Sequence, residues 1–433
     1  MPQPGYLDVT TTTIPTPPNP VNSGSVPKSF RGATIQPVGS SLSILATPAN
    51  GYLFGGWLDL DSNAIVSTQP KYTNPSMPLV LNLQAIFVPN PYLSGTYTGL
   101  LQGGSFAESG YMRLTLLPTG SFTAVFTLGQ ASTAKPLKSA FSLPAVLSNP
   151  VQFGGAISLP DGRIFDLVLT LNGGVIDGAL TNPSDGSSLN FTATRPVTAP
   201  VPPPVAALAG AYSAALLLPT PGAGLPEGFG AASITVTKTG AIHLAGNLGD
   251  GVKIAASGTL DATGAYPFYF YTAGSKTAGA EIALGKISAV LGNKPVQFTG
   301  ALDWSRNPIT LSTPPPYAAG FFTRLELTAD PSHPLSLLGS TAQITFSGGD
   351  LGTTTVVRSL DISTRGVVTP ASTTGGAFSL SYTAATGLFT GSFLDLGAKR
   401  TFTGALLQSQ NEGFGFFQET NGLTGSVLLQ SGP

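Results

Sequence analysis

The chain has 433 residues and a formal net charge of −1, and 9% of its residues are charged, against roughly 25% in an average soluble domain. Because it has no basic stripe and no polybasic run, the sequence argues against a nucleic-acid partner and against electrostatic binding to anionic lipid. The absence of cysteine excludes disulfides, thiolate zinc sites, iron–sulfur clusters and cysteine nucleophiles.

Glycine and proline are abundant, with 54 and 38 residues, yet 42% of the chain is hydrophobic and phenylalanine occurs 24 times. A disordered chain lacks the apolar surface that would offset its ordering entropy, whereas this chain has it. Many short strands separated by turns account for both facts, and no long stretch combines helical periodicity with caps. The sequence therefore predicts an all-β chain of tandem β-sandwich or β-barrel-like domains in an elongated array, with very little helix.

No apolar run in the sequence is long enough to span a membrane, and the first 20 residues show no signal peptide. Their threonines and prolines, Thr10–Thr13 and Ile14–Pro18, predict an extended linker that follows an upstream module, covering residues 1–20. Low charge, with threonine, serine, asparagine and glutamine on the outer faces, is common in extracellular β-proteins. We therefore expect an extracellular or cell-surface location.

Residues 21–90 read as a small β domain. Strands are predicted at 42–46, 52–57 and 79–87, with a turn at Pro48–Gly51. In the last strand, alternation places Leu79, Leu81, Leu83 and Ala85 on one face.

Three pieces of this domain carry a family resemblance: Ala46–Pro48, Gly51–Trp57 and Leu83–Phe87. With its Gly-aromatic-Gly-Trp element and its closing strand, the segment resembles the divergent internalin-type B-repeat of bacterial surface proteins. The resemblance implies a small β-grasp-like or β-sandwich module, used in tandem as a spacer or adhesive stalk. That family has no catalytic residues to transfer.

The rest of the chain contains internal repeats. Leu93–Thr98 aligns with Leu208–Ser213, and Gly120, Leu128 and Gly129 align with Gly240, Leu248 and Gly249. A third set of similar segments comprises Pro150–Ala156, Pro295–Ala301 and Thr401–Leu406. These repeats predict a β domain at 91–196 and a second copy beginning at 207.

The proline-rich residues 197–206 predict a semi-rigid spacer between the two copies. Residues 207–433 are about twice as long as one repeat, so they form either one composite barrel or two subdomains. Because the sequence has only a weak break at Asp330-Pro331 and no long linker, we favour the composite. Hairpin turns are predicted at four Asp-Gly pairs, namely Asp161-Gly162, Asp177-Gly178, Asp185-Gly186 and Asp250-Gly251.

Candidates for catalysis are few. The two histidines, His243 and His333, have no serine or aspartate motif beside them, so a Ser–His–Asp triad is poorly supported. A carboxylate pair stays open among 20 acidic residues, although turn positions account for most of them. We predict no catalytic residue and no enzymatic activity.

Asp59, Asp61 and Asn63 present oxygen ligands at alternate positions, as at the start of a calcium loop. The glycine and the distal glutamate of a full loop are missing, so a solvated loop is the simpler interpretation. Ca²⁺ bound by these three residues is the one cofactor that the sequence offers.

The aromatic run 266–271 is unusual. In a strand, Phe268 and Phe270 share one face while Tyr269 and Tyr271 share the other. The two tyrosines could bind a ligand by stacking on sugar rings or on another protein. Alternatively, they pack under a loop or on a neighbouring domain while the phenylalanines fill the core.

Together these features predict a non-enzymatic structural or adhesive segment of an exported bacterial cell-surface or matrix protein, with self-assembly into a filament as a variant. Its partners would be other proteins, copies of itself or surface glycans. The alternative is a carbohydrate-binding module or glycan-active protein that uses exposed aromatics. A phage or virus structural protein is also compatible with the composition.

Overall fold

The computed structural model describes residues 3–14, 22–129, 132–133, 135–142, 150–172, 174–275, 278–291, 295–351, 354–372 and 376–432. In these residues helix is confined to α1 (Pro203–Ala206) and to three short 3-10 turns, η1 (Lys28–Phe30), η2 (Leu335–Leu338) and η3 (Gly349–Leu351). The predicted all-β fold is therefore confirmed. No helix in the described part of the chain is long and apolar enough to cross a membrane.

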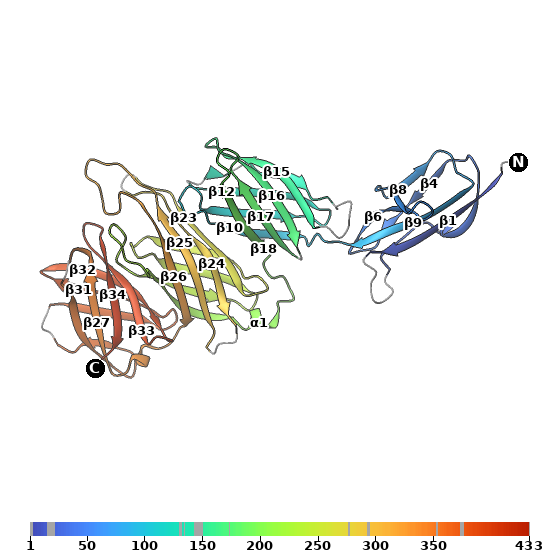
Figure 1. Cartoon of the computed structure of the whole chain (residues 1–433). Helices are drawn as coiled ribbons and strands as arrows, with labels where there is room; N and C mark the ends of the chain where they lie inside the picture. The colour runs from blue at the N-terminus through green and yellow to red at the C-terminus, as the bar shows by residue number, and fades with distance from the viewer. Residues whose placement is uncertain are drawn as a thin grey trace.

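The N-terminal module is built on a five-stranded sheet with strand order β3-β1-β9-β6-β7, accompanied by the two-stranded pairs β2-β5 and β4-β8. Its core surrounds Trp57 and Phe87, which are fully buried. Figure 1 shows this module extending away from the rest of the molecule. Its strands are β1 (Pro4–Thr13), β2 (Gly24–Ser25), β3 (Gly32–Pro37), β4 (Leu42–Leu45), β5 (Thr47–Pro48), β6 (Tyr52–Asp59), β7 (Ala64–Ser67), β8 (Lys71–Asn74) and β9 (Val80–Pro89).

The predicted linker at residues 1–20 is wrong over β1. This strand pairs antiparallel with β3 and parallel with β9, and it buries Leu7 and Val9 completely in the core of the module. Leu79 also differs from its prediction, because it precedes β9 and is 53% exposed. The remainder of the predicted linker, residues 15–20, lies outside the described residues.

Three barrel-like sheets follow in chain order, and we name them the first, second and third barrels (Figure 1). Each is an antiparallel meander whose first and last strands pair: β10 with β18, β19 with β26, and β27 with β34. Among the described residues, the strand order ends at β13 and β15 in the first barrel, at β22 and β23 in the second, and at β29 and β30 in the third. Each sheet is therefore open between its two end strands.

The first barrel comprises β10 (Gly95–Leu101), β11 (Gly110–Leu116), β12 (Ser121–Leu128), β13 (Ser132–Thr133), β14 (Leu137–Ala140), β15 (Val151–Ser158), β16 (Ile164–Asn172), β17 (Val175–Thr181) and β18 (Ser188–Thr194). The second comprises β19 (Gly210–Leu217), β20 (Gly230–Val236), β21 (Ala241–Asn247), β22 (Lys253–Thr259), β23 (Ala265–Thr272), β24 (Glu281–Val290), β25 (Gln297–Arg306) and β26 (Phe321–Pro331). The third comprises β27 (Thr341–Gly348), β28 (Val356–Ile362), β29 (Val368–Pro370), β30 (Phe378–Thr383), β31 (Leu388–Asp395), β32 (Ala398–Leu407), β33 (Glu412–Gln418) and β34 (Thr424–Ser431).

Residues 207–433, for which the sequence favoured one composite barrel, form two separate sheets. Each has its own core, around Phe298 and Trp304 in the second barrel and around Phe346 and Phe393 in the third. The sequence gives no long linker between them because the connection from β26 to β27 is short and contains η2. The exact limits of the predicted domains stay a prediction.

The proline-rich segment 197–206 lies on the second barrel and does not act as a spacer. Val205 is fully buried in the core of that barrel, and Val197 and Val201 pack against the same core. The Val197 amide donates to the Leu260 carbonyl at 2.8 Å. Valines placed between the prolines supply apolar surface, and burying that surface holds the segment against the barrel.

The repeated Gly-x-Tyr opening has a structural cause. Tyr97 donates its hydroxyl proton to the Leu93 carbonyl at 2.6 Å, and Tyr212 donates to the Leu208 carbonyl at 2.8 Å. Both tyrosines are buried at the start of the first strand of their barrels, so each fixes the entry of the chain. The third set of similar segments does not mark equivalent positions in the three barrels. Its members fall on β15, β25 and β32, which hold different places in the strand order of their barrels.

Candidate functional site: a cleft between the first and second barrels

The aromatic run 266–271 occupies β23 and divides between two environments. Phe268 and Phe270 point into the core of the second barrel, while Tyr269 and Tyr271 point outward and pack in a cluster with Ile282 and Leu284. This cluster also contains Phe106 and Leu100 of the first barrel. The two candidate ligand-binding tyrosines therefore lie in the seam between the first and second barrels.

Ring stacking strengthens this seam. Tyr111 of β11 stacks on Tyr269 with ring centroids 5.4 Å apart and an angle of 27° between the planes. Burial raises the pKa of Tyr269 to about 12, so its hydroxyl stays neutral. Across the same seam, Gln102 Nε2 donates to Asp303 Oδ2 at 2.9 Å. Tyr269 therefore contributes to the contact between the two barrels, and with Tyr111 it also lines a cavity of about 340 Å³. Ligand binding by Tyr269 and Tyr271 stays a prediction.

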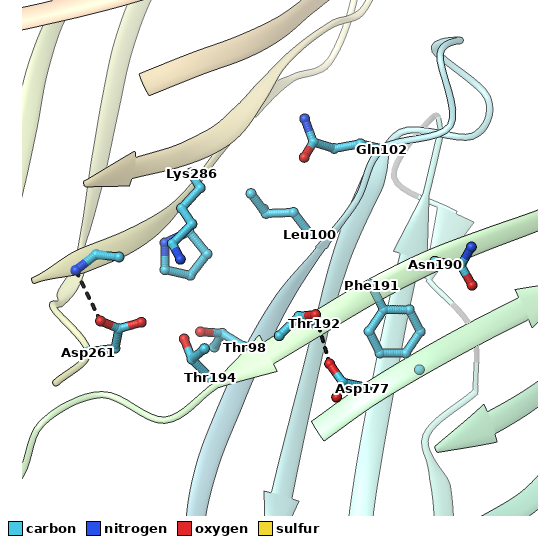
Figure 2. A pocket seen from close by; sticks show the side chains of 13 residues that line it. Thr98, Leu100, Gln102, Asp177, Asn190, Phe191, Thr192, Thr194, Asp261 and Lys286 are labelled. Carbon is cyan, nitrogen blue, oxygen red and sulfur yellow. Dashed lines mark hydrogen bonds between the residues drawn. The ribbon is translucent and has the colours of Figure 1, made fainter. Parts of the chain in front are cut away.

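Beside this seam lies a cleft of about 440 Å³. Strands β10, β17 and β18 of the first barrel form one wall, and β23, β24 and the turn before β23 form the other (Figure 2). A volume of this size lies in the range typical of small-molecule sites, roughly 300–1,000 Å³. The sequence offered no direct sign of the cleft, because its residues come from distant strands.

The cleft lies where the first and last strands of the first barrel pair over a short length. These strands, β10 and β18, pair only at Thr98–Thr194 and Gly99–Ala193. The equivalent strands of the second and third barrels pair at six and seven positions. Beyond these two pairs β10 and β18 diverge, and residues from both diverging ends, including Leu100 and Thr192, line the cleft.

Polar side chains of both charges line the walls. Asp177 accepts a hydrogen bond from Thr192 Oγ1 at 2.9 Å. Asp261, which is 6% exposed, accepts bonds through Oδ1 from Thr263 Oγ1 at 2.6 Å, from the Thr263 amide at 2.8 Å and from the Ala265 amide at 3.0 Å. Figure 2 shows Lys286 extending from β24 on the opposite wall to Asp177.

The hairpin turn predicted at Asp177-Gly178 is wrong, and this places the Asp177 side chain on a strand that lines the cleft. The sequence placed a hairpin at Asp177-Gly178, but both residues lie inside β17. Gly178 is needed there for a different reason, since a Cβ at this position would lie 2.1 Å from the ring of Phe191 on the paired strand. Of the other three Asp-Gly pairs, all form turns with a positive φ at glycine: Gly162, Gly186 and Gly251.

The candidate calcium residues lie in the turn between β6 and β7. Asp59 accepts hydrogen bonds from the Asp61 amide at 3.0 Å and from Ser62 Oγ at 2.9 Å, and these bonds, the amide first, lower the pKa of Asp59. Asp61 accepts two bonds from Asn82, and Asn63 has a φ of 52° in the turn. Within the described residues, no group of three or more histidine, aspartate or glutamate side chains could hold a metal ion. Calcium at this turn stays a prediction.

Neither histidine belongs to a triad. His243 Nδ1 lies 2.7 Å from Ser257 Oγ on an exposed face, and no carboxylate hydrogen-bonds His243 among the described residues. His333 takes part through its main chain, where its carbonyl accepts the Tyr382 hydroxyl. A serine–histidine pair without an orienting acid lacks the third member of a triad.

The structure also contains a buried ionic cluster that the sequence did not predict. Arg306 of β25 pairs with Asp250 and with Glu281, and Trp304 Nε1 donates to Glu281 Oε1 at 2.5 Å. Burial, together with the nearby Asp250 charge, raises the pKa of Glu281 to about 8. All four side chains are at most 8% exposed. Because Asp250 was predicted only as a turn residue, nothing in the sequence connected it with the other three.

A second cluster of the same kind lies in the third barrel. Arg400 pairs with Asp350 at 2.6 Å, with Asp395 at 3.0 Å and with Glu419. Asp350 and Glu419 come from connections between strands, while Arg400 points inward from β32. Both clusters tie loops to the inside of a barrel, and neither borders the cleft.

Comparison with known proteins identifies one part of the chain. Residues 14–91 match the family model of the Divergent InlB B-repeat domain. The N-terminal module thus contains a bacterial repeat domain, and the predicted resemblance is confirmed. The match does not extend into the three barrels. No curated protein matches the chain.

Solved structures with some likeness to the chain include three of transferrin binding protein B. A double mutant of the Haemophilus parasuis Hp5 protein is 11% identical, with 92% of this chain and 78% of that chain covered and a TM-score of 0.19. The isotype 1 protein of serogroup B Neisseria meningitidis is 10% identical, with 94% and 86% covered and a TM-score of 0.18. Intact Ap-TbpB is 11% identical, with 78% and 77% covered and a TM-score of 0.18. With TM-scores this low, these likenesses support no inference about function.

Proposed function

We propose that the chain is a non-enzymatic structural or adhesive segment of an exported bacterial cell-surface protein, and that it works as a stiff arm of β modules. The observation that carries this proposal is that successive barrels are joined by packed seams. Flexible tethers would allow each barrel to move by itself, whereas buried apolar contacts between modules hold one arrangement. The B-repeat at residues 14–91 supports the surface location, since the resemblance implies such a setting.

The seam between the second and third barrels is the more extensive of the two in its polar contacts. Ala215, Leu407 and Phe414 form a buried apolar cluster there, and Phe229 meets Phe414 edge to face at 5.9 Å. Ser213 Oγ donates to the Leu406 carbonyl at 2.5 Å. Removing such hydrogen-bonding groups from water without a partner would be costly, so the pairing favours a single docked geometry.

The N-terminal module also contacts the first barrel. Leu53 packs against the core of the first barrel, and Asn90 Nδ2 donates to the Pro118 carbonyl at 2.8 Å. The arm therefore has contacts at each of its three junctions. Self-assembly of such arms into a filament is a variant of the proposal, for which the open barrel edges at β22, β23, β29 and β30 would provide unpaired strands.

Accessibility on intact host cells tests the location that this proposal requires. An antibody against the three barrels should label unpermeabilised cells, and added protease should remove the label. A chain found only inside the cells, protected until they are lysed, would overturn the proposal. Deletion of the barrels should also reduce attachment of the cells to surfaces or to one another, with growth in suspension unchanged.

A further inference from the structure

We propose that the cleft between the first and second barrels binds a neutral saccharide. This rests on the adhesive function proposed above and names the ligand class that one surface of the arm would recognise. The cleft is distinct from the two tyrosines that the sequence suggested for stacking on sugars, because those side chains are engaged in the seam.

The first reason is the short pairing between the first and last strands of the first barrel. The first and last strands pair at six positions in the second barrel and at seven in the third, but at only two in the first barrel. The cavity lies where this pairing stops. Strand pairing would satisfy main-chain groups and add stability, so its loss has to be offset elsewhere. The neighbouring barrel shields this opening without filling it, which leaves a space for a small ligand.

The second reason is the chemistry of the walls. Thr98, Thr192 and Asn190 both donate and accept hydrogen bonds, while Asp177 accepts them and Lys286 donates them. Among the ion pairs of the described residues none includes Lys286, so its ammonium is available for a ligand. A sugar carries hydroxyl groups that both donate and accept, and it can pair with all of these side chains.

The third reason is charge and apolar surface. The cleft contains two carboxylates, Asp177 and Asp261, against one ammonium, so phosphate and other anions would meet net repulsion. Leu100 of β10 and Pro267 of β23 both line the cleft and give apolar surface for the C–H faces of a sugar ring. Small-molecule sites commonly combine such apolar contacts with a few fixed polar groups.

A peptide is the less favoured occupant. An extended peptide that adds to a sheet needs an edge running alongside several of its residues, at about 3.3 Å per residue. In this cleft the pairing of β10 with β18 at Thr98–Thr194 and Gly99–Ala193 closes one end of the space between the two strands. A compact ring needs less length along the strands than an extended chain does.

The test is binding of the whole chain to an array of immobilised neutral, amino and sialylated glycans, followed by calorimetry with the strongest neutral oligosaccharide. Asp177→Ala and Lys286→Ala should each weaken binding about tenfold or more, because each removes a charged hydrogen-bonding partner. The matched controls are Asp166→Ala on β16 and Lys253→Ala on β22, two exposed residues outside the cleft, and these should bind as the parent chain does.

Three results would overturn the inference. These are no binding to any neutral glycan, equal binding by the cleft variants and the controls, or binding of inorganic phosphate or an extended peptide in the cleft in place of sugar. A chain that labels intact cells but binds no glycan would remove the saccharide site and leave the adhesive arm standing. A chain confined inside the cells would remove the arm, whatever the array showed.

Discussion

Glu281 is a carboxyl group held inside the second barrel with one arginine and a second carboxyl group, Asp250. Two negative charges against one positive charge in a buried site would leave an uncompensated charge, which is costly. A proton on Glu281 neutralises the cluster, and this explains why burial and the Asp250 charge raise the pKa of Glu281 to about 8. The cluster therefore holds the connection between β21 and β22, which carries Asp250, most firmly when Glu281 is protonated.

This protonation makes stability depend on pH. Glu281 titrates near 4.5 in the unfolded chain and at about 8 in the folded protein, so between these values the folded state holds the extra proton. Stability from this group is complete at low pH and falls as the pH rises through about 8. We predict that the urea midpoint declines across this window, and that Glu281→Gln, which cannot ionise, flattens the decline.

The matched control for that measurement is Glu326→Gln, which changes an exposed glutamate on β26 of the same barrel and should keep the slope of the parent chain. Equal slopes in the parent chain and in Glu281→Gln would contradict the account of the cluster. The comparison uses differences between variants, because other carboxyl groups also contribute to the pH dependence of the parent chain.

At the residue scale the sequence predicts side-chain direction well and chemical partnership poorly. The alternation of Phe268 and Tyr269 was readable, since strand side chains alternate between faces. What Tyr269 packs against was not readable, because Tyr111 is far away in the sequence and on another barrel. Gly178 misled the turn prediction, because glycine serves a turn and an overlying aromatic ring equally well.

At the scale of elements, the strand β26 connects two barrels through one buried side chain. Asp330 is fully buried and accepts bonds from the Ser409 amide at 2.7 Å and from Ser409 Oγ at 2.6 Å, across the seam to the third barrel. Its other oxygen accepts from Gln297 Nε2 at 2.8 Å within the second barrel. One carboxylate thus satisfies donors on both sides of the junction.

Asp330→Ala should uncouple the two barrels. The change leaves the Ser409 donors without an acceptor, at a cost of about 1–3 kcal/mol. We expect one cooperative urea transition of the second and third barrels to become two, with each barrel unfolding separately. Asp166→Ala, an exposed change in the first barrel, is the control and should leave the transition as it was. A single unshifted transition for Asp330→Ala would show that the seam does not depend on this contact.

Element prediction succeeded where patterning was periodic and failed where composition dominated. The strand β1 alternates Leu7 and Val9 with polar residues, but its threonines and the prolines after it suggested a linker. Residues 197–206 were judged by their prolines, although Val205 among them enters a core. In both segments a few apolar residues determine the structure, because the free energy gained by burying them outweighs the local stiffness of the chain.

At the scale of the whole molecule, the tandem order of modules was predictable and their contacts were not. The repeated openings at Tyr97 and Tyr212 marked two barrels, whereas the third barrel has Ala342 near its start and gave no such signal. The cleft is a property of two barrels docked side by side, so it exists only once the chain has folded. Sequence patterns describe one strand at a time and carry no information about that docking.

The central claim is that packed seams hold the modules as one stiff arm, and small-angle scattering over a concentration series tests it most directly. The account predicts an elongated monomer at every concentration, with a curve that a single arrangement of the modules in Figure 1 reproduces. A curve that requires barrels moving independently, or a compact particle, would contradict the claim. Growth into long particles as concentration rises would replace the single arm with the filament variant.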